Sequence, residues 1–119
     1  MVDPREAART LIRRHQAEER RAEERASGLR ERLPEAARLL REMGAREVWL
    51  FGTLAWGGFH AHSDADLAVA GLPPEAWARA AAAVEDVLGA MVDLVRFEEI
   101  DDAFGHRIRT EGERIDGAH

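Results

Sequence analysis

The sequence predicts a single α/β domain in which helices pack on a small β-sheet. Three short apolar runs rich in β-forming residues are predicted as strands, at residues 47–52, 64–71 and 91–97. Segments with helical spacing of apolar residues flank and separate them, and such alternation is typical of an α/β sandwich. We expect an N-terminal helical extension over residues 1–27 and one main domain over residues 28–119.

Residues 4–27 consist almost entirely of Ala, Glu and Arg and predict one long helix, with Asp3 as N-cap and Pro4 at the first helical position. This helix does not carry the heptad pattern of a coiled coil, because Glu18 and Arg25 occupy positions where the helix–helix contact needs apolar residues. Two interpretations stay open. The helix is either a solvated one that leans on the domain by its first two turns, or a docking helix for a homodimer or a partner protein.

Three further helices are expected after an interruption at Gly28. Their apolar residues recur at amphipathic spacing, and glycines mark two of their ends. The predicted ranges are 29–44, 75–88 and 100–111.

Composition narrows the possible functions. The formal charge of −6 argues against a sequence-independent nucleic-acid binder. All the basic residues are Arg, so neither a P-loop lysine nor a Schiff-base lysine is available. Without cysteine there is no disulfide framework and no thiolate metal site, and no apolar run approaches the roughly 20 residues that span a bilayer. A soluble, cytoplasmic protein without a signal peptide is expected.

Aspartates inside predicted strands are the anomaly of this sequence. Asp is depleted from strands, and a buried carboxylate needs a partner. Asp64 and Asp66 stand at alternate positions and should share one face, and Asp93 stands alone in the third strand. If the second and third strands adjoin, the carboxylates of all three converge at one end of the sheet.

Converging carboxylates require cations, because like charges a few Å apart raise one another's pKa. Oxygen ligands without cysteine suit Mg²⁺, which leaves positions for phosphate oxygens and water. Two such ions can clamp the entering and leaving oxygens of a phosphoryl or nucleotidyl displacement. The loop before the aspartates fits a phosphate ligand: Gly52 permits close backbone approach, Thr53 offers a hydroxyl, and Gly57 and Gly58 add freedom.

The stretch GTLAWGGFHAHSDADL resembles the signature of the DNA polymerase β nucleotidyltransferase superfamily. It is most similar to minimal nucleotidyltransferases, whose pattern runs approximately GSxARGxxxxxSDxDL. The segments VDLV around Asp93 and RTEGERI near the C-terminus are also similar, so that the resemblance covers roughly residues 29–115. The positions that match directly are Gly52, Ala55, Gly57, Ser63, Asp64, Asp66 and Leu67, with Thr53 in place of the usual serine.

The resemblance implies a polymerase β-like fold, a small mixed sheet with helices packed on it. It also implies that a hydroxyl attacks the α-phosphate of ATP and releases pyrophosphate. Asp64 and Asp66 would bind both magnesium ions, and Asp93 would bind the catalytic ion and help to deprotonate the acceptor. The nucleotide would be held by Gly52, Thr53, Gly57 and Ser63.

This sequence departs from the family pattern in the loop. Leu54 and Trp56 stand where the family often has arginines, so the site loses cationic help with phosphate. Arg46 and Arg96 are candidates to replace it. His60 and His62 are interpreted as solvated loop residues.

The module leaves no second domain for an acceptor, so the acceptor is expected to bring its own binding surface. Minimal nucleotidyltransferases of this kind resemble the antitoxin half of two-gene modules whose toxin is a helical HEPN-type ribonuclease. The resemblance implies transfer of AMP from ATP to a tyrosine hydroxyl of that toxin. Two alternatives remain: a nucleotidyltransferase of a small molecule such as an aminoglycoside, and an antitoxin that inhibits by sequestration without turnover.

Overall fold

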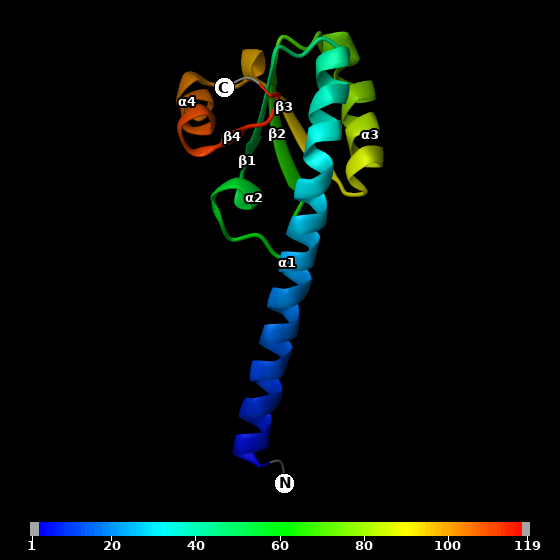
Figure 1. Cartoon of the computed structure of the whole chain (residues 1–119). Helices are drawn as coiled ribbons and strands as arrows, with labels where there is room; N and C mark the ends of the chain where they lie inside the picture. The colour runs from blue at the N-terminus through cyan, green and yellow to red at the C-terminus, as the bar shows by residue number, and fades with distance from the viewer. Residues whose placement is uncertain (1–2, 118–119) are drawn as a thin grey trace.

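A computed structural model of the chain, which describes residues 3–117, confirms the α/β fold with a mixed sheet and a long N-terminal helix (Figure 1). The helices are α1 (Pro4–Glu42), α2 (Thr53–Trp56), α3 (Trp77–Leu88) and α4 (Asp102–Glu111), with short 3₁₀ turns at Pro74–Ala76 and Phe97–Glu99. The strands are β1 (Glu47–Phe51), β2 (Ala65–Ala70), β3 (Val92–Arg96) and β4 (Glu113–Arg114).

The predicted break at Gly28 is wrong, because α1 runs without interruption through Gly28 and Pro34. Gly28 and Pro34 cost helix stability, roughly 1 and 3 kcal/mol in a helix interior. That cost is offset by tertiary packing, because the second half of α1 buries a helical stripe against the sheet: Leu29, Leu33, Ala36, Ala37 and Leu40. The N-terminus is as predicted, with the Asp3 carboxylate accepting a hydrogen bond from the backbone N–H of Arg5 at 3.0 Å.

The four strands lie in the order β3-β2-β1-β4. β1 is antiparallel to both β2 and β4, whereas β2 and β3 are parallel and are connected through α3. The sequence did not predict β4, a two-residue strand whose Glu113 pairs with Leu50. The sheet is therefore mixed, with β2 and β1 at its centre and β3 at one edge, beside β2.

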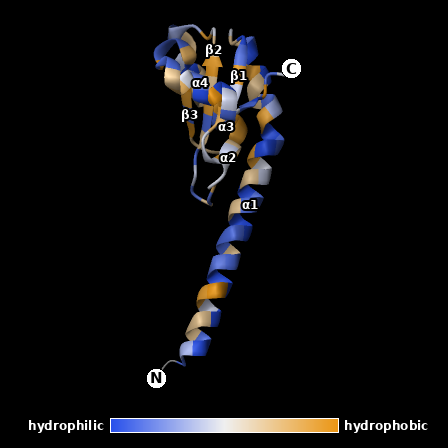
Figure 2. Cartoon of the chain, turned by 90° about the vertical axis from the view of Figure 1, so that its left-hand side faces the viewer, coloured by the Kyte–Doolittle hydropathy of each residue, from blue (hydrophilic) through white to orange (hydrophobic). Residues whose placement is uncertain are grey.

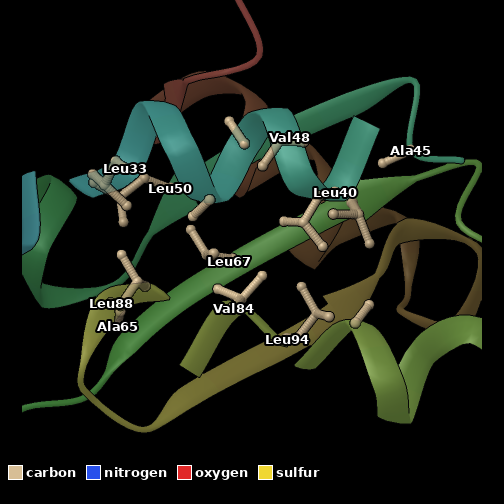
Figure 3. Packing of buried hydrophobic residues seen from close by; sticks show 14 of the residues in the cluster. Leu33, Leu40, Ala45, Val48, Leu50, Ala65, Leu67, Val84, Leu88 and Leu94 are labelled. Carbon is tan, nitrogen blue, oxygen red and sulfur yellow. The ribbon is translucent and has the colours of Figure 1, made fainter. Parts of the chain in front are cut away.

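The two faces of the sheet carry different layers (Figure 1). The larger core packs α1 and α3 on one face, and it includes Leu67 and Leu94 from neighbouring strands (Figure 3). The smaller core packs α4 on the other face through Ile108, and it includes Phe51 and Ala68. Because side chains alternate along a strand, Asp66 and Asp93 belong to the face that carries α4.

The outer half of α1 projects away from the sheet (Figure 1), and the molecule measures 62 × 30 × 25 Å. Figure 2 shows this half as mainly hydrophilic with a hydrophobic band near its N-terminal end. Leu11 and Ile12 are 64% and 56% exposed there. The interpretation that the helix leans on the domain by its first two turns is therefore wrong. Within residues 3–117, no helix is long and apolar enough to cross a bilayer.

Candidate active site

The structure brings two of the predicted aspartates together on adjacent strands. Asp66 of β2 and Asp93 of β3 are direct partners in the parallel register, as the sequence predicts if these strands adjoin. Asp64 lies just before β2, which begins at Ala65, so it sits at the mouth of the strand rather than inside it. Asp66 is half-buried, whereas Asp64 and Asp93 are exposed. The carboxylate-bearing end of β2 therefore opens to solvent.

Asp66 has an unusual ionisation. Burial, reinforced by the negative charges of Asp93 and Asp64, raises the pKa of the Asp66 carboxyl to about 6. The same two charges indicate that the three side chains form one electrostatic cluster. A bound cation would favour the ionised form of these carboxylates and so stabilise the cluster.

Gly52 lies against the Asp66 carboxylate. Its φ is +73°, and a Cβ built there would lie 2.1 Å from Asp66 Oδ2. No residue with a side chain fits this position without displacing Asp66. The sequence predicts that the backbone approaches another group closely at this glycine. In the structure that group is the Asp66 carboxylate.

The donor set fits Mg²⁺ in kind, since it consists of carboxylate oxygens on one edge of the sheet. Within residues 3–117, however, no three His, Asp or Glu side chains are already drawn together as ligands of one ion. Burial raises the pKa of Asp66, and repulsion by Asp93 and Asp64 adds to it. Carboxylates without a cation between them repel one another, which agrees with side chains that are near one another but not drawn together.

The loop between β1 and β2 contains the other predicted site residues. Gly52 caps α2, whose first residue is the partly exposed Thr53 and whose end is capped by the exposed Gly57 at a φ of +109°. Ser63 is buried, and its Oγ accepts a hydrogen bond from the His60 backbone N–H at 3.0 Å. Ser63 thus closes a turn of this loop, while Thr53 and Gly57 lie at its surface.

Two arginines of α1, which no sequence motif predicted as site residues, hold this loop. Arg25 Nη2 donates to the Ser63 carbonyl at 3.1 Å, and Arg30 Nη2 donates to the Leu54 carbonyl at 2.7 Å. Arg30 also pairs with both carboxylate oxygens of Glu113 at 3.0 Å, and this hydrogen bonding raises the pKa of Arg30 and lowers that of Glu113. The α1 helix is therefore part of the framework of the site, although no motif marks these arginines.

The sequence model of the family described as polymerase beta, nucleotidyltransferase, matches residues 37–117. The chain belongs to this nucleotidyltransferase family. The match spans β1 to β4 and includes all three aspartates of the cluster. No curated protein matches the chain in a sequence comparison.

Solved structures agree with this assignment. A protein proposed to be a minimal nucleotidyltransferase is 30% identical, with a TM-score of 0.67 over 73% of this chain and 92% of its own. A toxin–antitoxin complex crystallised with AMP-PNP is 28% identical, with a TM-score of 0.60 over 69% of this chain and 70% of its own. An MntA–HpeT toxin–antitoxin mutant, with two aspartates two positions apart changed to glutamate, is 25% identical, with a TM-score of 0.60 and the same coverage.

The structure does not bring the two arginines that the sequence suggests as replacements to the loop. Arg96 pairs with Val69 at the far end of the parallel strands, and its buried side chain donates to the Leu72 carbonyl at 2.8 Å. Arg46 precedes β1, and its backbone N–H donates a hydrogen bond to the Ala70 carbonyl at the same far end. Neither arginine lies at the aspartate end, so both candidates are wrong.

A different arginine lies beside the loop. The guanidinium carbon of Arg107 in α4 is 4.4 Å from the centroid of the Trp56 ring. Trp56 in turn lies 6.2 Å from Phe51, ring to ring, and Phe51 pairs with Asp66 across the strands. Spacing along the sequence could not place Arg107 here, because α4 and α2 meet only through the tertiary fold.

Proposed function

We propose that this chain is a Mg²⁺-dependent nucleotidyltransferase that transfers AMP from ATP to a hydroxyl group of a partner protein. The observation that carries the proposal is the pairing of Asp66 with Asp93 beside Gly52, with Asp64 near enough to perturb the pKa of Asp66. Carboxylates in this arrangement have little use in folding, because they repel one another. They are suited to holding cations against a polyphosphate.

The proposed roles follow the positions of the residues. Asp64 and Asp66 would hold two Mg²⁺ ions, and Asp93 would hold one of them. When bound, these ions would neutralise charge on the phosphates and on the attacking and leaving oxygens. Thr53, at the start of α2, would donate its hydroxyl and backbone N–H to the triphosphate, and Gly57 would let the loop close on it.

The reaction is an in-line displacement at the α-phosphorus. The acceptor hydroxyl oxygen forms a bond to that phosphorus, and the bond to the oxygen bridging the β-phosphate breaks, so pyrophosphate leaves. The hydroxyl proton passes to the Asp93 carboxylate, which is exposed and can be approached by a protein acceptor.

The acceptor is proposed to be a tyrosine hydroxyl of a HEPN-type toxin, with this chain acting as the antitoxin. Two of the solved relatives are chains of toxin–antitoxin complexes, and one of those complexes holds AMP-PNP, an analogue of ATP. The exposed outer half of α1, with Leu11 and Ile12 on its surface, offers such a partner a place to dock.

The test separates catalysis from sequestration. The full chain is used to capture its partner from the source organism, and the captured protein is then co-expressed with variants of the chain. Asp64→Ala with Asp66→Ala should retain capture but lose rescue of growth, while the control Asp86→Ala, on the exposed surface of α3, should retain both. Rescue by the double variant would overturn the catalytic proposal and leave an antitoxin that acts by sequestration.

A further inference from the structure

We propose that Arg107, held on the ring of Trp56, binds the triphosphate of the nucleotide. This inference rests on the proposed function and deepens it. It assigns a phosphate-binding residue to an element, α4, that contributes none of the aspartates. Trp56 is then a positioning residue, because it orients the cation and does not itself contact phosphate.

The geometry links Arg107 to the loop and to the aspartates. Its guanidinium carbon lies 4.4 Å from the Trp56 ring centroid, within the range of a cation–π contact. The Trp56 backbone N–H donates to the Gly52 carbonyl at 3.0 Å, and Gly52 lies against Asp66. Trp56 thus lies one helical turn from the carboxylate cluster and holds Arg107 over the same loop.

The Trp56 ring is itself held in place. Its centroid is 6.2 Å from that of Phe51, and Phe51 packs edge-on against Phe104 of α4 at 5.5 Å. Packing on both sides of Phe51 joins α4 to the end of β1. A guanidinium resting on this platform loses less conformational freedom on binding an anion than one at the end of a free side chain.

Arg107 also has capacity for an anion. Its Nε donates to Glu111 at 2.8 Å, and among the described residues its two terminal amino groups have no hydrogen-bond partner. By contrast, Arg30 is committed to Glu113 and to the Leu54 carbonyl. Arg107 is exposed on the face of the sheet that carries Asp66 and Asp93, so a phosphate group can reach it.

The test measures binding of ATP and of AMP to the full chain in the presence of Mg²⁺ by calorimetry. Arg107→Gln should weaken ATP binding about tenfold, near the lower end of what a hydrogen bond between charged groups contributes, because this site is open to solvent. AMP binding should change less than twofold, because AMP lacks the β- and γ-phosphates. Arg107→Lys should restore part of the affinity for ATP.

Two further variants test charge against packing. Glu111→Gln removes the carboxylate that competes for Arg107 and should tighten ATP binding about twofold to threefold. Arg109→Gln is the matched control, because Arg109 also stacks on an aromatic ring of this layer, at 3.9 Å from Phe97, but pairs with Glu47 at the far end of the sheet. The Arg109→Gln variant should bind ATP with the same affinity as the unchanged chain.

Each outcome has a distinct meaning. Unchanged ATP affinity in Arg107→Gln would overturn the inference and leave the proposed function standing. An equal loss of ATP and AMP affinity would also overturn it, because Arg107 would then act by holding the loop. If the unchanged chain binds no ATP with Mg²⁺, the proposed function fails together with the inference.

Discussion

Asp66 and Gly52 depend on each other for their positions at the end of the sheet. The half-buried Asp66 carboxylate occupies the space that a side chain at residue 52 would need. The glycine therefore serves the geometry of the carboxylate as well as the turn that starts α2.

Gly52→Ala should lower the free energy of unfolding by about 2 kcal/mol, because it combines an unfavourable positive φ with a clash against Asp66. Gly57→Ala is the control, since its φ is also positive but its Cβ meets nothing within 4 Å. Denaturant unfolding of both variants measures the difference. Equal losses would mean that the contact with Asp66 contributes nothing.

The ionisation of Asp66 gives a pH-dependent stability. Its folded pKa of about 6 lies above its ordinary pKa of 3.8, so the penalty for ionising it is absent below about 3.8, grows as pH rises from there to about 6, and is complete above that. Asp66→Asn should remove this penalty. In excess chelator at pH 7.5 the variant should be more stable by about 1 kcal/mol, after allowance for the solvent screening of a half-exposed group.

Urea unfolding between pH 4 and 7.5 measures this effect. The stability of the unchanged chain should fall relative to Asp66→Asn across that range, and parallel curves would contradict the assignment. Asp86→Asn, on the exposed surface of α3, is the control and should follow the unchanged chain.

At the scale of elements, sequence patterns predicted most of the helices and strands to within a few residues. They failed where tertiary contacts outweigh local preference. The core stripe of α1 carries the helix through Gly28, where a break was predicted. No local signal marks the two-residue β4, which exists because Glu113 and Arg114 pair with β1.

The continuity of α1 can be tested at Gly28. A Cβ at this position would meet nothing within 4 Å, and its φ is not positive, so Gly28→Ala should raise the free energy of unfolding by about 0.5–1 kcal/mol. Gly44→Ala, at a φ of +119° and 3.0 Å from Pro73 Cδ, should instead destabilise the chain. Destabilisation by Gly28→Ala would contradict a continuous helix.

The candidate site was predictable to the extent that its residues are close in sequence or lie on adjacent strands. Asp64 and Asp66 are two residues apart. Asp93 could be added because side chains alternate along a strand and because the second and third strands were assumed to be neighbours, as they are. Arg25, Arg30 and Arg107 come from helices whose approach to the loop depends on the whole fold, so no spacing could reveal them.

For the whole molecule, the aspartate cluster opens on the face that carries α4, and the outer half of α1 extends away from the body (Figure 1). An open site with a projecting helix suits an acceptor that is itself a macromolecule. This arrangement supports transfer to a protein over transfer to a small molecule, which would need an enclosing pocket.

The most direct test of nucleotidyl transfer uses ATP labelled with ³²P at either the α- or the γ-phosphate, together with Mg²⁺ and the captured partner. The partner should acquire the α-label and not the γ-label. Asp64→Ala with Asp66→Ala should abolish the transfer, while Asp86→Ala should not. Transfer of the γ-label, or no transfer of either label to a partner that binds tightly, would contradict nucleotidyl transfer.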